Sequence, residues 1–314
     1  MENTVVHHET ESAVRLYSEN QQRQWGSSAN LAPTMEEYIS LLHLAKLPTP
    51  YKTYVPTRIS IVKELFKVTR VRVQKLGDSK VTWEHLKELI KNEEGEQAHL
   101  YLLALAIHDL IIFPKELGTI DHATIDFVAQ VKEGANPVHG ILAETFWSLN
   151  KFWTKRHARL TCSVPLLYVW IMSHLPCIQG NFRASFSTVK IPLAEFEVAR
   201  WEEHASKTEW KDKLQHLDNK GIIWRAPWMD QSKVVYICGN LPCVPLLGPW
   251  GGISYAPLMF RIHVGTMQFI PMTHGLTNTQ FAYEADDSQK KVREFVVWWR
   301  HVHVVESSNQ NSGA

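Results

Sequence analysis

Histidine and cysteine are the residue types with the greatest capacity for metal binding, and the chain has 16 histidines and 4 cysteines. Cys238 and Cys243 are separated by four residues, whereas zinc ribbons use a tighter C-x2-C spacing, and Cys162 and Cys177 lie far away. The histidines are scattered and show no H-E-x-x-H pattern. We therefore predict buried structural thiols, ordinary structural or surface histidines, and no metal site.

The acidic residues do not form a recognisable catalytic pattern. Successive residues of a helix point about 100° apart, so the sequence neighbours His108-Asp109 and Asp121-His122 are not expected to act together. Asp109 lies in an apolar segment, where a structural hydrogen bond or salt bridge is favoured over a role as general base. A transposase or nuclease would need carboxylates clustered around Mg²⁺. Spacing singles out no such cluster among Asp109, Asp121, Asp126 and Glu144.

The glycine-rich segment 248–252 shares only its glycine content with a phosphate-binding loop. No Lys-Ser/Thr pair follows it, and its flanks do not read as a strand and then a helix. A tight turn that lets the backbone approach Trp250 is favoured instead. No G-x-S-x-G motif occurs, and no lysine stands out as a ligand for pyridoxal phosphate. The sequence thus predicts no catalytic residues and no cofactor.

Two stretches are locally basic in a chain whose net charge is only +1. The molecule as a whole therefore offers no attraction to nucleic acid, and any such binding must use local clusters of Lys and Arg. The solvated faces of amphipathic helices are the alternative interpretation. We expect any nucleic-acid binding to be weak, sequence-independent and steeply salt-dependent. The candidate nucleic-acid or partner surface comprises Arg58, Lys63, Lys67, Arg70, Arg72, Lys75, Lys151, Lys155, Arg156 and Arg159.

The composition, 45% hydrophobic and 21% charged, is that of a soluble globular protein. The first residues are polar and lack the apolar core of a signal peptide, and the few cysteines indicate a reducing compartment. The most apolar stretch, residues 98–113, is shorter than the ~20 residues needed to cross a bilayer. We therefore predict an intracellular protein without a membrane segment, in which this stretch forms a buried core helix.

Helix signals dominate the chain. Thr34 and Glu37 form a capping box, in which the side chain of each satisfies the backbone N–H of the other. Asp121 is suited to cap a helix, and Asn136-Pro137 is a cap followed by proline in the first turn. Helical periodicity is clear at the centre of the chain, where we expect helices over Ala98–Ile112 and Val138–Phe152.

Strand signals are few, and only 222–224 and 234–238 are persuasive. Prolines and glycines recur through 241–257, which favours a structured loop, and a last helix is expected over 288–301. We predict a mainly α fold, a compact helical domain with a few short strands and a Pro/Gly-rich loop region near 222–257. The predicted division is a disordered leader over 1–30, a single domain over 31–303 and a disordered tail over 304–314.

Several segments together resemble the plant mobile domain family, which is also described as aminotransferase-like. They resemble most closely the related, transposon-associated plant domain of unknown function, and they occur in that family's order. The matching segments are PTMEEYISLL (33–42), LALAIHDLIIFPKELGTIDHATIDFV (103–128), NPVHGILAETFWSLN (136–150), CSVPLLYVWIMSHL (162–175) and NLPCVPLLGPWGGISYAPLMFRIHVG (240–265).

The resemblance implies a mainly helical fold found in transposons and retrotransposons. It implies that domesticated relatives act in the nucleus in transposon silencing, genome stability and meristem maintenance, partly through a protein phosphatase partner. It supplies no catalytic residues. The segment that usually precedes the PTMEEY block is absent or replaced by residues 1–32, and the chain stops soon after residues 292–305. The resemblance therefore also implies a truncated copy.

These features predict a non-enzymatic, transposon-derived protein-interaction module that binds protein partners and no membrane. By resemblance, it is expected in the nucleus. One alternative is an enzyme that processes nucleic acid, such as a transposase or a nuclease. The other is a weak, non-specific nucleic-acid-binding module that uses the basic stretches.

Overall fold

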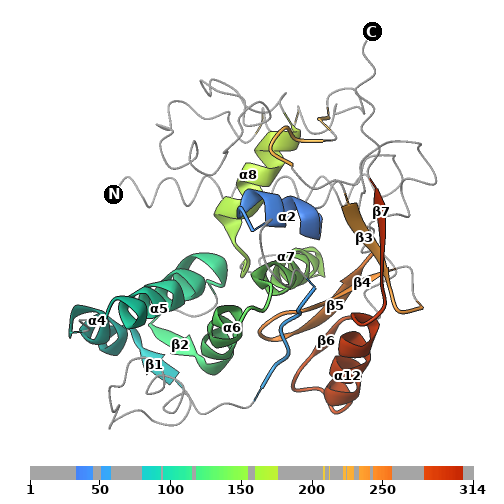
Figure 1. Ribbon diagram of the computed structural model, residues 1–314. Helices are drawn as coiled ribbons and strands as arrows, with labels where there is room; N and C mark the ends of the chain where they lie inside the picture. The colour runs from blue at the N-terminus through green and yellow to red at the C-terminus, as the bar shows by residue number, and fades with distance from the viewer. Residues whose placement is uncertain are drawn as a thin grey trace.

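Figure 1 shows the chain as a computed structural model. Of the described residues, 54% are helical and 16% lie in strands of small antiparallel sheets. The prediction of a mainly α fold is therefore wrong, and the architecture is mixed α/β. The structure describes residues 33–44, 51–57, 80–92, 95–114, 118–154, 160–175, 208, 212, 222–223, 225–229, 233–240, 243–256 and 279–306.

One part of the molecule is built from two short paired strands that each lead directly into a helix. Thr82 Oγ1 accepts a hydrogen bond from the His85 N–H, and Asp121 Oδ1 accepts one from the Thr124 N–H. These bonds satisfy N–H groups that a first helical turn leaves free. The elements are β1 (Lys80–Thr82), α4 (Trp83–Asn92), α5 (Glu96–Ile107), the π-helical turn η1 (His108–Ile112), β2 (Thr119–Asp121) and α6 (His122–Lys132).

Three helices form the centre of the fold: α2 (Met35–Leu41), α7 (Pro137–Thr154) and α8 (Val164–His174). The capping box of Thr34 and Glu37 is present at the start of α2, as predicted. Asn136 caps α7, where its Oδ1 accepts from the Val138 N–H. The predicted central segments Ala98–Ile112 and Val138–Phe152 are both helical.

A three-stranded antiparallel sheet lies beside α7, and a two-stranded sheet contacts its first strand (Figure 1). In one, β4 (Val244–Leu247) pairs with β5 (Gly251–Tyr255), which pairs with β6 (Phe281–Ala282). In the other, β3 (Lys233–Cys238) pairs with β7 (Val302–Glu306), and the register shifts within β3 between Val235 and Ile237. Helix α12 (Ser288–Trp298) lies between β6 and β7 in sequence.

The predicted Pro/Gly-rich loop is in part the buried hairpin β4–β5. The glycines of this hairpin are required because neighbouring atoms leave no space for a side chain. A Cβ at Gly251 would collide with the Phe281 carbonyl and lie 2.8 Å from the Trp147 ring. Only glycine lets the backbone of β5 approach β6 and α7 this closely. Because we read glycine as a loop signal, this hairpin was missed.

Two other boundaries differ from the sequence prediction. The strand expected over 234–238 is present as β3, whereas residues 222 and 223 are not in a strand. The last helix ends at Trp298, and β7 then extends to Glu306, past the predicted domain end at 303. His303 therefore lies on strand β7. The predicted leader, residues 1–30, lies outside the described residues.

Candidate functional site

The described cysteines, Cys162, Cys238 and Cys243, are buried free thiols, as predicted. Burial raises the pKa of the Cys238 and Cys243 thiols, which keeps both protonated at neutral pH. Among the residues that the structure describes, no group of three or more His, Cys, Asp or Glu side chains is placed to hold a metal ion. Cys177 lies outside those residues, so the absence of a metal site stays a prediction.

Two of the carboxylates considered for catalysis hold separate segments together. Asp121 caps α6 and also accepts a hydrogen bond from Trp250 Nε1 at 2.8 Å. Asp126 accepts from the Tyr54 hydroxyl and from the Thr57 N–H, both at 2.8 Å. These hydrogen bonds give the two acids a structural role, because a carboxylate that accepts from several donors joins the segments that carry those donors.

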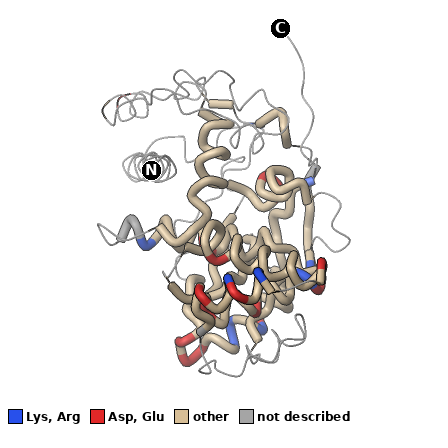
Figure 2. Tube along the Cα trace, turned by 90° about the vertical axis from the view of Figure 1, so that its left-hand side faces the viewer, with Lys and Arg blue, Asp and Glu red and all other residues tan. Residues whose placement is uncertain are grey.

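A cleft of about 890 Å³ opens between the start of α6, the segment 54–57 and the turn before α12. Acidic side chains outnumber basic ones on its walls, so its potential favours cations over phosphates. Figure 2 shows acidic and basic residues of the described chain side by side, mostly in the lower half of the view. The charged residues that line the cleft are Asp121, Asp126, Glu284, Asp286 and Arg293.

Two described residues that line the cleft, Ser288 and Thr57, carry hydroxyl groups. Both hydroxyls donate structural hydrogen bonds. Ser288 Oγ donates to the Tyr283 carbonyl at 2.9 Å. Thr57 Oγ1 donates to Asp126, whose carboxylate also accepts from other donors. A serine or threonine nucleophile needs a base that is free to take its proton. Neither hydroxyl has such a base among the described residues, so neither is placed to act as a nucleophile.

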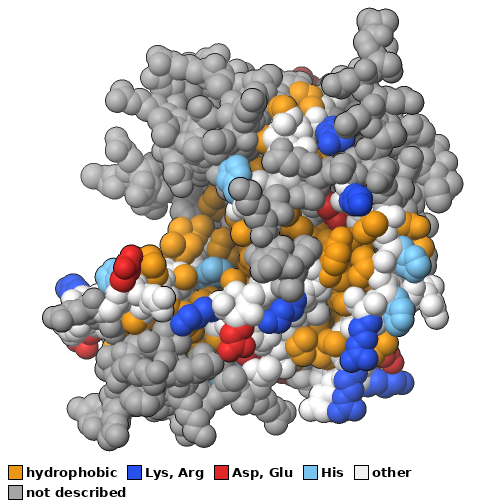
Figure 3. Space-filling view, in the orientation of Figure 1, with side chains coloured by type: hydrophobic (Ala, Val, Ile, Leu, Met, Phe, Trp, Pro, Cys, Tyr) orange, Lys and Arg blue, Asp and Glu red, His pale blue; other side chains and the backbone are white. Residues whose placement is uncertain are grey.

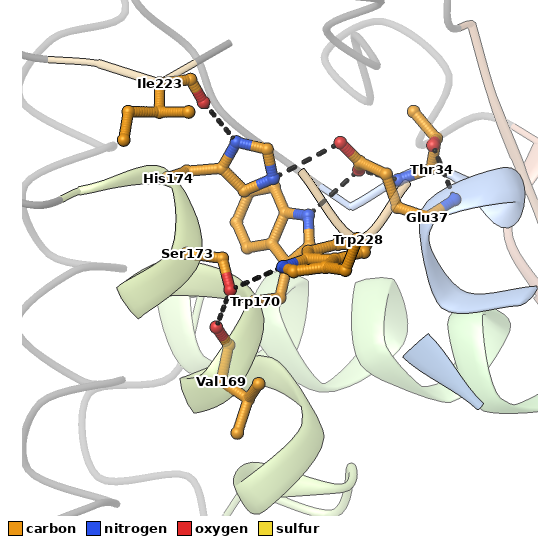
Figure 4. Close-up of polar contacts among 8 residues, drawn as sticks. All are labelled: Thr34, Glu37, Val169, Trp170, Ser173, His174, Ile223 and Trp228. Atoms are coloured by element: carbon orange, nitrogen blue, oxygen red, sulfur yellow. Dashed lines mark hydrogen bonds and ion pairs between the residues drawn. The ribbon is translucent and has the colours of Figure 1, made fainter. Parts of the chain in front are cut away.

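The buried carboxylate of Glu37 joins two helices (Figure 4). Its Oε2 accepts hydrogen bonds from the Thr34 N–H and from Trp170 Nε1, both at 2.9 Å. Its Oε1 lies 3.3 Å from Nε2 of His174. Glu37 belongs to α2, and Thr34 is the N-cap of that helix, whereas Trp170 and His174 belong to α8. This carboxylate therefore holds α2 against α8.

Both nitrogens of the His174 ring lie close to oxygen atoms of other residues. Nδ1 lies 2.6 Å from the Ile223 carbonyl oxygen, so Nδ1 carries a hydrogen. Nε2 then faces the Glu37 carboxylate, but the contact is not aligned as a hydrogen bond. The two side chains are 1% and 2% exposed, which seals the pair from any substrate.

Ser173 is next to His174 in sequence but is not part of a catalytic triad. Its hydroxyl donates to the Val169 carbonyl at 2.8 Å and accepts from Trp228 Nε1 at 2.9 Å (Figure 4). In a triad the serine proton is directed at the histidine, whereas here it is directed at the backbone. The group formed by Glu37, Ser173 and His174 is therefore a structural network.

Two further buried titratable groups were missed by sequence reasoning. Burial raises the pKa of Glu36 to about 7, although the Val235 N–H donates to its Oε1 at 2.9 Å and partly offsets this effect. Its Oε2 has no hydrogen-bond partner among the described residues. Burial lowers the pKa of His139 to about 3, and its ring stacks on Trp299 with centroids 4.4 Å apart. Neither position carries a local sequence signal, because the burial arises from tertiary packing.

The helix expected to be fully buried, residues 98–113, instead exposes one apolar face. Its inward side packs on α4 and α6 and includes Leu102, Leu105 and Asp109. Its outward side leaves large apolar side chains 38–57% exposed. In Figure 3, hydrophobic side chains are visible on the surface over α5, on the left of the view. This apolar face consists of Leu100, Leu103, Ile107, Leu110 and Ile111.

Most of the predicted basic surface cannot be placed. Arg58, Lys63, Lys67, Arg70, Arg72, Lys75, Lys155, Arg156 and Arg159 lie outside the described residues. Lys151 is exposed on α7, and its Nζ lies 5.5 Å from the centre of the Trp147 ring. Within the described part of the chain, no helix is long and apolar enough to cross a membrane. Nucleic-acid binding therefore stays a prediction.

The fold and these sites define a mixed α/β domain that uses its buried polar groups for structure and exposes one apolar helix face. The chain belongs to the family described as Domain of unknown function (DUF7745), whose model matches residues 26–313. Comparisons with curated proteins and with solved structures gave no match. The resemblance to the plant mobile domain family stays a prediction.

Proposed function

We propose that this protein is a non-enzymatic interaction module that binds partner proteins through the apolar face of α5 and η1. The observation that carries the proposal is the exposure of five Leu and Ile side chains on this one helical segment. Contiguous apolar patches of about 300–600 Å² on a soluble protein are often functional. Covering such a face with a partner removes apolar surface from water, which favours association.

The composition of the segment favours a protein partner over a membrane surface. Helices that lie on membranes carry Lys and Arg on their polar face, which attract anionic lipid. Residues 96–112 contain neither Lys nor Arg. The π-helical turn η1 supports a binding role, since such turns are frequent at functional sites. An apolar face without basic flanks fits the apolar core of a protein interface.

The catalytic alternative has less support from the described residues. The Glu37, Ser173 and His174 network is sealed, and Asp121 and Asp126 hold segments together. A transposon-derived origin, a nuclear location and a phosphatase among the partners belong to the proposal through the family resemblance alone. They do not follow from the geometry.

A comparative co-purification tests the proposal. We expect the Leu103→Glu/Ile107→Glu variant to lose the proteins that co-purify with the wild type, because two buried carboxylates in an apolar interface would be unpaired. Val297, on α12, is 47% exposed and provides the matched control, Val297→Glu. Retention of the same partners by the double variant, with the control unchanged, would show that another surface is used.

A further inference from the structure

The apolar face has the spacing of a helix that pairs with another helix. Leu100, Leu103, Ile107 and Leu110 are separated by three, four and three residues, which is the a/d repeat of a coiled coil. All four side chains are exposed. A repeat of this kind presents apolar side chains in a single line along one helix, so its natural occupant is a second helix.

The turn η1 extends this face beyond the end of α5. Its backbone bond runs from the Phe113 N–H to the His108 carbonyl at 2.7 Å, which spans five residues instead of four. Ile111, four residues after Ile107, is exposed on the same face together with Leu110. Ala104 and Ala106, beside the repeat, are small and leave room for close approach of another helix.

The charges of the segment make it compatible with itself. No Asp, Glu, Lys or Arg occurs between Glu96 and Asp109, and Asp109 is buried on the inward side. A charged partner helix would therefore find nothing to pair with along this face. A second copy of the same face brings no charge into the contact, so nothing is left desolvated and unpaired.

The area is close to what a dimer needs. Five Leu and Ile side chains that are 38–57% exposed leave on the order of 400 Å² of apolar surface, within the usual range for functional patches. The surface of an interface is about 57–65% apolar, so this apolar area corresponds to a total buried surface of roughly 600–700 Å² per protomer. A standard interface buries about 800 Å² per partner. The contact thus fits a dimer of modest affinity.

We infer that the protein forms a symmetric dimer in which α5 of one copy packs antiparallel on α5 of the other. The inference rests on the proposed function, because it names the partner of the same face. Parallel pairing would put Glu96 beside its own copy, whereas antiparallel pairing keeps the two carboxylates roughly 27 Å apart. In a two-fold contact, residue i meets j and j meets i. Leu103 of each copy therefore faces Ile107 of the other.

Sedimentation equilibrium of the purified full chain measures the dimer directly. We expect a reversible dimer in the wild type, and a dissociation constant at least about 100-fold higher for Ile107→Glu, which puts two carboxylates into the apolar core. Val297→Glu should dimerise as the wild type does. A wild type that stays monomeric up to about 100 μM, or a dimer that survives Ile107→Glu, overturns the inference.

Disulfide trapping tests the orientation. A mixture of the Leu103→Cys and Ile107→Cys variants should give more cross-linked dimer under mild oxidation than either variant alone, because antiparallel packing brings the two positions together. Stronger cross-linking of each variant with itself would show parallel packing and contradict the geometry. If the chain is monomeric yet co-purifying partners depend on Leu103 and Ile107, the dimer is wrong and the proposed function stands.

Discussion

Replacing Glu37 with alanine is expected to destabilise the protein by about 2–6 kcal/mol, because two buried hydrogen-bond donors lose their acceptor at a cost of about 1–3 kcal/mol each. The substitution leaves the Thr34 N–H and Trp170 Nε1 without their common acceptor. The hydrogen bond from Trp170 Nε1 in α8 to the Glu37 carboxylate in α2 is then lost. Urea unfolding followed by tryptophan fluorescence measures the change in the free energy of unfolding.

Glu284→Ala is the matched control, because this carboxylate is exposed at the rim of the cleft. It should change stability by no more than about 0.5 kcal/mol. A double-mutant cycle with Glu37→Gln and His174→Gln should show a coupling energy of about 1 kcal/mol or more, since the two groups are in direct contact. Additive effects, or a cost below about 1 kcal/mol for Glu37→Ala, would mean that the network does not hold the two helices.

Glu36→Gln is expected to stabilise the protein at alkaline pH but not at acidic pH. Burial raises the pKa of Glu36 from 4.5 to about 7, so the native state binds more protons than the unfolded state between these values. The contribution of protonated Glu36 to the free energy of unfolding is therefore fully present below pH 4.5. It is lost as the pH rises through about 7. Gln mimics the protonated acid and can still accept the Val235 N–H.

The expected advantage of Glu36→Gln is close to zero near pH 4.5 and on the order of 3 kcal/mol at pH 8, from the size of the pKa change. Comparing the variant with the wild type at each pH cancels the titration of other groups. One of these is His139, whose lowered pKa acts in the opposite direction. Glu284→Gln should show no such pH dependence. An equal difference at both pH values would mean that Glu36 is not buried as described.

The local parts of the fold could be predicted from the sequence. The capping box of Thr34 and Glu37, the Asp121 cap and the start of α7 depend on residues within a few positions of one another. The hairpin β4–β5 could not, because proline and glycine are also typical of loops. Gly251 is required by the approach of β6 and of Trp147, which lies 104 positions earlier in the chain.

Most of the candidate sites are formed by residues far apart in the sequence, and the sequence patterns did not predict them. Glu37 was identified as a cap, but its contacts with Trp170 and His174 join segments 133 or more residues apart. Large apolar residues occur on both the inward and the outward side of residues 98–113, so periodicity predicted the helix but not which side faces solvent. Only packing against α4 and α6 distinguishes the two sides. Thus the most apolar segment, which we predicted as core, contains the surface on which the proposed function rests.

Photo-crosslinking from the apolar face tests this proposed function most directly. A photoreactive phenylalanine analogue would replace Ile107, which is 51% exposed, or Val297, which is 47% exposed on α12. The account predicts discrete protein adducts in cells from position 107, including a second copy of the chain, and few from position 297. Equal adducts from both positions, or none from position 107 when the protein is folded and abundant, would contradict it.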